Sequence, residues 1–125
     1  MKIKTTFASF SAPDLKKEEG FYSKTLGLKA ELGPMGLSLS LPGGAGTFIY
    51  EKKDHKPAAF TVLNFTVDNI DEAVDELGKK GVKFERYPSM PADEKGIVRG
   101  RSQKMGPDIA WFEDPAGNIL SVLQE

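Results

Sequence analysis

The feature that most constrains the fold of this chain is a weak internal repeat. The stretch "FSAPDLKKEEGFYSKTLGLKAE", which begins at Phe10, resembles "FTVDNIDEAVDELGKKGVKFE", which begins at Phe65. Phe10 and Phe65 are 55 positions apart, whereas Gly27 and Gly81 are 54 apart, so the register slips by only one residue. A repeat of this length indicates that one structural unit occurs twice along the chain.

The helix of the second copy has a regular pattern. Ile70, Val74 and Leu77 lie at the spacing of one buried helix stripe. Asp68 or Asn69 can cap the first turn, because both side chains accept hydrogen bonds from free backbone amides. The pattern therefore predicts an amphipathic helix that begins near residue 70.

The helix of the first copy is less regular. Leu15, Tyr22 and Leu26 form an apolar stripe, which the glutamates at 18–19 interrupt. Gly27 stands where a helix commonly ends in a left-handed residue. We expect a helix here that ends before Gly27.

Candidate strands follow each helix and predict the same unit twice. We expect strands at about 28–33, 36–41 and 47–52 in the first half, and at about 82–87, 108–113 and 118–123 in the second. Turn-forming residues at 42–46 and 114–118 predict that each half ends in a hairpin. The expected fold class is α+β, with two βαβββ modules (about 1–53 and 60–125) in a single domain over 1–125, and with both helices on one face.

Composition narrows the possible functions. The net charge of −1 gives no electrostatic basis for nucleic acid or an anionic membrane as a partner. No stretch approaches the roughly 18 apolar residues that a membrane span needs, so we expect a cytoplasmic protein. The absence of cysteine excludes thiolate nucleophiles and Cys-based zinc sites. The single histidine, His55, lies in the polar stretch "KKDHKPAA", where we expect a solvated surface side chain.

The segment 88–107 breaks the symmetry of the two halves. It is rich in proline, glycine and charge, and structureless loops of this length are typically lids or binding loops. A mobile surface loop with a short strand at 97–98 is the alternative. Arg99 and Arg101 in this segment could receive an anionic group through bidentate contacts, or could simply be solvated.

With these features together, the chain resembles the vicinal-oxygen-chelate superfamily, which includes glyoxalase I, extradiol dioxygenases and bleomycin-resistance proteins. Three stretches carry the resemblance over essentially the whole chain, namely "APDLKKEEGFYSKTLGLK", "FTVDNIDEAVDELGKKGVKF" and "AWFEDPAGNILSVLQE". The resemblance implies a curved mixed sheet with the helices on its outer face and the ligand or reaction site in its concave cup. It also implies a homodimer, in which the modules pair within one chain or are exchanged with a second copy.

The resemblance further implies four metal-ligand positions, which metal-dependent members fill mainly with His and Glu. In this chain the four positions are Phe7, Tyr50, Val62 and Ser121. Phe7 and Val62 have no donor atom, Ser121 is a weak neutral ligand and Tyr50 would have to lose a phenolic proton. Sites for zinc, nickel or iron generally need three ligands drawn from His, carboxylate or Cys, so we expect no metal and no cofactor.

Without a metal, the cup becomes a mostly apolar surface with a few polar groups, which is typical of a small-molecule pocket. Period-two alternation adds further side chains to the face of the four positions, namely Ser9, Phe48, Asn64, Thr66, Ile119 and Leu123. One of Trp111 and Phe112 should also face inward. The predicted ligand-binding residues are Phe7, Ser9, Phe48, Tyr50, Val62, Asn64, Trp111, Ser121, Arg99 and Arg101. The alternative is that this face is a filled core in which Asn64 and Ser121 bond to backbone.

Three functions remain open on these grounds. The leading hypothesis is a glyoxalase/bleomycin-resistance-like protein that binds a small, partly apolar organic molecule in the cup without a metal. The first alternative is a lyase, isomerase or dioxygenase with an atypical ligand set, or with Tyr50, Asp93 or Glu94 as acid or base. The second alternative is a degenerate module that only dimerises.

Overall fold

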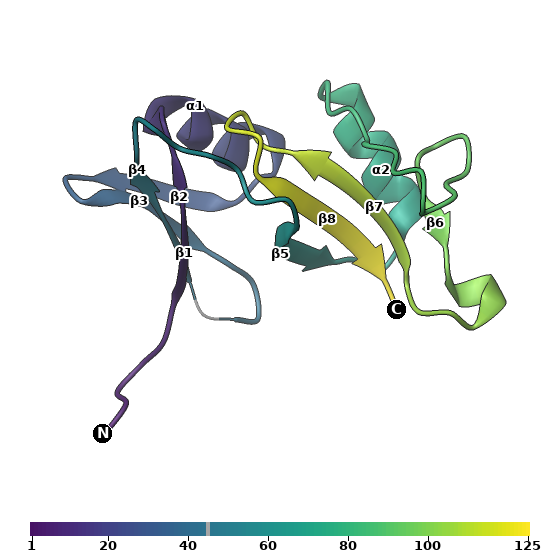
Figure 1. Ribbon diagram of the computed structural model, residues 1–125, viewed down its shortest axis with the longest axis horizontal. Helices are drawn as coiled ribbons and strands as arrows, with labels where there is room; N and C mark the ends of the chain where they lie inside the picture. Colours follow the sequence, from purple (N-terminus) through teal and green to yellow (C-terminus); the bar gives the residue numbers. More distant parts are fainter. Residues whose placement is uncertain (45) are drawn as a thin grey trace. The chain divides into compact units, whose positions relative to one another are not determined.

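The computed structural model describes residues 1–44 and 46–125, and the chain divides into two compact units, Met1–Pro57 and Ala58–Glu125 (Figure 1). The boundary between the units lies in the stretch that separates the two predicted modules. Ala45, which belongs to the predicted turn at 42–46, lies outside the described residues. Each unit contains a four-stranded mixed sheet and a helix, so the predicted α+β class with two βαβββ modules is confirmed.

The first unit has the sheet order β1-β4-β3-β2. Its elements are β1 (Ala8–Ala12), α1 (Leu15–Gly20), a π-helical segment (Phe21–Thr25), β2 (Lys29–Gly33), β3 (Gly36–Ser40) and β4 (Thr47–Glu51). β1 pairs with β4 in parallel, and the other neighbours are antiparallel. The three strands predicted after the first helix are confirmed to within one residue at each end.

A capped helix start organises this unit. The Asp14 carboxylate accepts hydrogen bonds from the backbone amides of Lys16 and Lys17 at 3.2 and 3.3 Å, which begins α1. After the π-helical segment the chain reverses at Gly27, whose φ of 70° matches the predicted helix end. The helical segments cover one face of the sheet, where the fully or almost fully buried side chains are Tyr22, Leu37, Leu39 and Ile49.

The second unit has the corresponding order β5-β8-β7-β6. Its elements are β5 (Thr61–Thr66), α2 (Ile70–Lys79), β6 (Val98–Arg99), a 3₁₀ turn (Arg101–Gln103), β7 (Asp108–Glu113) and β8 (Ile119–Gln124). β5 and β8 are parallel, and β8, β7 and β6 are antiparallel neighbours. The strands predicted at 108–113 and 118–123 are confirmed.

The predicted helix of the second unit is also confirmed. The Asn69 side chain caps α2 by accepting a hydrogen bond from the Glu72 amide at 3.1 Å. Ile70, Val74 and Leu77 are buried on the helix side that contacts β7 and β8. The covered sheet face contributes Ala110, Phe112, Leu120 and Val122 to this core. None of the helices in the described part of the chain is long and apolar enough to cross a membrane.

The strand predicted at 82–87 is wrong. Within this stretch only Glu85 forms a bridge to the main sheet, to Trp111 of β7. The outer edge of β7 is instead occupied by β6, in which Val98 pairs with Ile109. β6 takes the edge of β7 at residues 108–109, and the earlier segment meets β7 further along, at Trp111 alone. The alternation of apolar and polar residues at 82–87 therefore reflects side chains that are half-buried beside the sheet. It does not reflect a ladder of strand hydrogen bonds.

Candidate ligand-binding site

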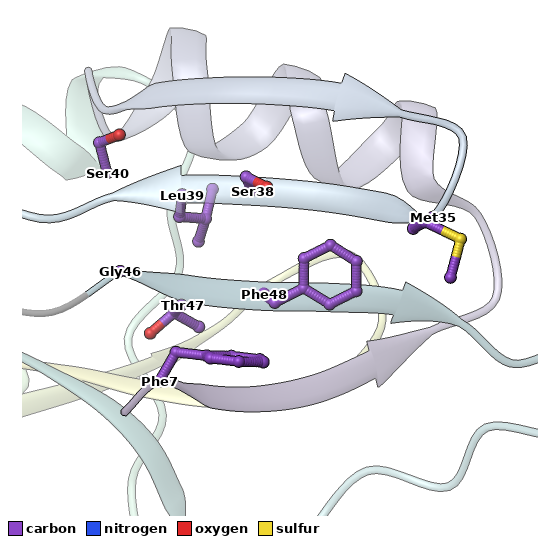
Figure 2. A pocket seen from close by; sticks show the side chains of 8 residues that line it. All are labelled: Phe7, Met35, Ser38, Leu39, Ser40, Gly46, Thr47 and Phe48. Atoms are coloured by element: carbon purple, nitrogen blue, oxygen red, sulfur yellow. The ribbon is translucent and has the colours of Figure 1, made fainter. Parts of the chain in front are cut away.

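A pocket of about 490 Å³ lies on the first unit (Figure 2). Phe48 projects from the middle of β4, and its cross-strand partners are Ser9 on β1 and Ser38 on β3. Phe7, just before β1, is 68% exposed, and Met35, in the turn between β2 and β3, is 80% exposed. The pocket is lined by Phe7, Met35, Ser38, Leu39, Ser40, Gly46, Thr47 and Phe48. It combines two aromatic rings and a thioether with serine hydroxyls.

Gly36 makes room for the Phe48 ring beside this pocket. A Cβ atom at Gly36 would lie 2.6 Å from Cζ of Phe48 and 2.6 Å from the carbonyl oxygen of Ile49. The φ angle of Gly36 is 150°, which residues with a side chain rarely adopt. Glycine at this position therefore lets the ring pack against bare backbone.

Tyr50, another predicted pocket residue, lies on the same strand as Phe48 but outside the pocket lining. Its cross-strand partner is Ser11, whose hydroxyl oxygen is 2.6 Å from Nδ1 of His55. The His55 ring is partly buried, and its Nε2 has no hydrogen-bond partner within residues 1–44 and 46–125. The expectation that His55 is a solvated surface residue is therefore wrong, because the linker that contains it folds back onto β1.

On the second unit, three predicted site residues form one row across the sheet face opposite α2. Ser121 of β8 is the direct partner of Asn64 on β5 and of Trp111 on β7. The Ser121 hydroxyl donates a hydrogen bond to Oδ1 of Asn64 at 2.5 Å. Ser121 is fully buried, whereas Asn64 is exposed. The Ser121 hydroxyl is therefore used to hold a neighbouring amide.

The Trp111 side chain in this row is fixed from two sides. Its indole Nε1 donates a hydrogen bond to the Thr61 hydroxyl at 3.1 Å, and the Tyr87 ring packs edge to face at 5.5 Å. Phe112, the next residue, is fully buried on the α2 side of the sheet. Of the two aromatic residues considered from sequence, Trp111 is the one on the site face.

Thr61 was missed by sequence reasoning because a bulge precedes the row. The pairing of β5 with β8 shifts between Thr61 and Leu63, so that Thr61 is the partner of Ile119 and Val62 is the extra residue. No glycine or proline marks this bulge in the sequence. The family resemblance placed Val62 in the site, and alternation along the strand from Val62 passes over Thr61, which is the residue that contacts Trp111.

Two of the expected metal-ligand positions, Tyr50 and Ser121, do not lie at equivalent points of their units. Tyr50 pairs with Ser11, but Ser121 pairs with Asn64. The 55-residue offset of the repeat relates Ser11 to position 66, so the two pairs differ by two residues along the strand, or about 7 Å. A shift of two residues keeps both side chains on the same face of their sheets. It changes how far along the strand each side chain lies.

These positions do not suit a metal ion. Phe7 and Val62 provide no donor atom, and the Ser121 hydroxyl is buried and bonded to Asn64. In the described part of the chain, no group of three or more His, Cys, Asp or Glu side chains is placed to hold a metal. The donor set therefore does not fit the metal chemistry that the resemblance implies.

Arg99 and Arg101 are engaged by aspartates. Arg99 donates two hydrogen bonds to Asp71, at 2.7 and 3.0 Å, and one from Nε to Asp93 at 2.9 Å. Arg101 lies 3.6 Å from the Asp108 carboxylate. The hydrogen bonds from Arg99 lower the pKa of Asp71 to about 2. An anionic ligand would have to compete with these carboxylates, so the predicted role of both arginines stays a prediction.

The segment 88–107 is tied to the unit by further contacts. The Asp93 carboxylate accepts hydrogen bonds from the amides of Lys95 and Ile97, both at 2.9 Å, and Ile97 is fully buried. Arg86 donates to the carbonyl oxygens of Asp93 and Glu94 at 2.8 and 3.0 Å. The middle of the segment is therefore ordered and packed against the second unit. The Asp93 carboxylate, considered above as an acid or base, is occupied by structural bonds.

Comparison with known proteins now identifies the family. The model of the Glyoxalase/Bleomycin resistance protein/Dioxygenase superfamily matches residues 6–122. The chain belongs to this superfamily. No curated protein matches the sequence.

Solved structures share the fold over essentially the whole chain. An integron cassette protein from the Halifax Harbour sewage outfall metagenome is 22% identical, with a TM-score of 0.70 and coverage of 98% of this chain and 100% of that one. A superfamily member from Sphaerobacter thermophilus is 24% identical, with a TM-score of 0.69 and 98% of both chains covered. TnmS3, an antibiotic binding protein from a Streptomyces species, is 21% identical, with a TM-score of 0.65 and coverage of 99% and 98%.

Proposed function

We propose that this glyoxalase/bleomycin-resistance-like protein binds a small, partly apolar organic molecule without using a metal. The observation that carries the proposal is the pocket of about 490 Å³ on the first unit. Its volume falls within the ~300–1,000 Å³ that small-molecule sites occupy. Two aromatic rings and a methionine with a few hydroxyls are the usual lining of such a site.

The exposure of the lining supports a binding role. Phe7 and Met35 are 68% and 80% exposed, which leaves large apolar side chains in water at the mouth of a pocket. Clustered exposed apolar surface commonly marks a ligand or partner site. Among the structures with the same fold is an antibiotic binding protein, which supports binding as a function that this fold can perform.

Titration with the fluorescent probe 8-anilinonaphthalene-1-sulfonate tests this proposal. We expect saturable binding of one probe per chain, weakened about tenfold or more by Phe7→Ala or Phe48→Ala, which corresponds to ~1.4 kcal/mol of lost ring contact. Phe60→Ala is the matched control, because Phe60 is similarly exposed, at 69%, but is not part of the pocket lining. Equal affinity in the Phe7 and Phe60 variants would refute binding at this pocket.

Calorimetric titration of the untagged protein with Ni²⁺, Zn²⁺ and Fe²⁺ tests the metal-free part of the proposal. We expect no stoichiometric binding at neutral pH, because the four expected ligand positions lack suitable donors. Probe affinity should be the same with and without each metal. Stoichiometric metal binding that strengthens probe binding would favour the enzyme alternative instead.

A further inference from the structure

We propose that Ser121 aims the side-chain amide of Asn64 so that its NH₂ group donates a hydrogen bond to a neutral carbonyl-type oxygen of the ligand. The inference goes beyond the proposed function, because it assigns a separate contact surface on the second unit and the polar chemistry of the ligand that this surface would bind. Asn64 is assigned as the residue that touches the ligand. Ser121 is assigned as a positioning residue that acts through Asn64.

The hydrogen bond between the two side chains sets the direction of the amide. The Ser121 hydroxyl donates to Oδ1 of Asn64, so the oxygen end of the amide is held against β8. The NH₂ end has no hydrogen-bond partner within residues 1–44 and 46–125. An amide has two donor hydrogens at this end, and they are left to water or a ligand.

Burial separates the roles of the two residues. Ser121 is fully buried between its cross-strand neighbours, so its hydroxyl is not accessible to a ligand in this arrangement. Asn64 is exposed on the same sheet face. The serine side chain is small enough to be buried between Asn64 and Trp111. Its hydroxyl hydrogen still reaches Oδ1 of Asn64 and fixes the exposed amide.

The rest of the row limits what the ligand can be. Trp111 is the other neighbour of Ser121, and its half-buried indole reaches across β8 to Thr61 on β5, the strand that also carries Asn64. Its Nε1 hydrogen is already donated to Thr61, so Asn64 is the donor that this row offers. A suitable ligand would have a flat apolar part that packs against Trp111 and an oxygen that accepts a hydrogen bond from Asn64.

The charges nearby favour a neutral acceptor. Glu113 lies two residues along β7 from Trp111, on the same face, and its carboxylate would repel an anionic ligand. Arg99 and Arg101, which could attract an anion, are paired with aspartates. An amide NH₂ group is a neutral donor, which suits a ketone, amide or lactone oxygen better than a carboxylate.

The test compares 2-acetylnaphthalene with 2-ethylnaphthalene, which differ by one carbonyl oxygen. Binding is followed by ¹H–¹⁵N NMR, using the Asn64 side-chain amide and the indole signal of Trp111, the only tryptophan in the chain. We expect the ketone to bind about fivefold more tightly, the effect of one net hydrogen bond, and to shift the Asn64 side-chain signals. Asn64→Asp should reduce the ratio of the two affinities to about one without weakening the hydrocarbon.

Two further variants test the positioning role. Ser121→Ala should lower the ketone preference at unchanged hydrocarbon affinity, and Ser121→Thr, which keeps a hydroxyl, should restore it. Ser102→Ala, in the exposed 3₁₀ turn of the same unit and outside the sheet, is the control and should keep the full preference. A purely structural role for Ser121 would weaken both probes equally and would overturn the inference.

The outcomes separate this inference from the proposed function. If both naphthalenes bind the wild type equally, ligand binding stands and the donor role of Asn64 is refuted. If neither binds while 8-anilinonaphthalene-1-sulfonate still binds at the Phe7 and Phe48 pocket, the second-unit site is refuted alone. If none of the three probes binds, the proposed function itself fails.

Discussion

At the scale of single residues, a glycine beside the pocket makes room for one of its two aromatic rings. A Cβ atom at position 36 would lie 2.6 Å from Cζ of Phe48, so only glycine lets the ring occupy this place. Aromatic rings in a site are useful when their position is fixed before the ligand arrives, because less rotamer freedom is then lost on binding. The packing of Phe48 over Gly36 provides such a fixed ring.

We therefore expect Gly36→Ala to lower the free energy of unfolding by about 1–3 kcal/mol and to weaken 8-anilinonaphthalene-1-sulfonate binding. Urea unfolding and the probe titration measure the two effects. Gly33→Ala is the control, because a Cβ atom at Gly33 would meet nothing closer than 3.9 Å and its φ is not positive. If Gly36→Ala behaves like Gly33→Ala, the ring is not positioned by Gly36.

At the scale of elements, ion pairs attach the irregular segment before β7 to α2. Arg99, at the end of β6, bonds to Asp71 in the first turn of α2, and Lys95 lies 3.1 Å from Asp75 one turn later. β6 has only two residues, so its own ladder contributes little. We infer that the bidentate contact between Arg99 and Asp71 holds β6 at the sheet edge.

Because the pKa of Asp71 is lowered, the contribution of this attachment to stability should depend on pH. Its pKa falls from 3.8 to about 2, chiefly through the hydrogen bonds from Arg99. The lowered pKa means that the charged Asp71 carboxylate stabilises the folded state at pH values above 3.8. This stabilisation is lost as the pH falls towards 2 and the carboxylate is protonated. We expect Asp71→Asn to lower the Tm at neutral pH and the difference from wild type to shrink as the pH falls through this range.

Thermal unfolding followed by circular dichroism over a pH series measures this difference. Asp68→Asn is the matched control, because Asp68 is exposed just before α2 and is not part of the ion-pair cluster. Its Tm should follow that of the wild type at every pH. A constant Tm difference for Asp71→Asn down to pH 2 would show that the carboxylate does not stabilise the fold through its charge.

At the scale of the whole molecule, several large apolar side chains are left in water by a single chain. Phe7, Met35 and Phe60 are each more than two-thirds exposed. Exposed apolar side chains of this size are commonly covered by a ligand or another chain. We propose that a second copy of the chain covers one or more of these side chains in a homodimer.

Light scattering coupled to gel filtration tests the dimer. We expect a mass of about twice the 13.7 kDa of one chain, which falls to the mass of one chain only on strong dilution. Phe60→Asp should shift the equilibrium towards the single chain if Phe60 lies in the interface. A mass of one chain throughout a wide concentration series would contradict the proposal.

The amino-acid sequence by itself determined the repeated unit, the class of fold and the faces of most elements. The stripe that begins at Ile70, the Asn69 cap and the strand at 108–113 are all local patterns, and each is present as expected. Local patterns are reliable here because backbone periodicity and capping depend on neighbours within a few residues. The same alternation placed Asn64 and Ser121 on one face, where they are direct partners.

Only the tertiary structure decided which side chains on those faces meet. The bulge that brings Thr61 to Trp111, the contact of His55 with Ser11 and the pairing of Arg99 with Asp71 each join residues that are 28 or more positions apart. Alternation states which face a side chain occupies, but it contains no information on strand register, bulges or the path of a linker. Partners of polar side chains depend on these features, so a hydroxyl that the sequence placed in a ligand cup lies instead beneath the amide that it holds.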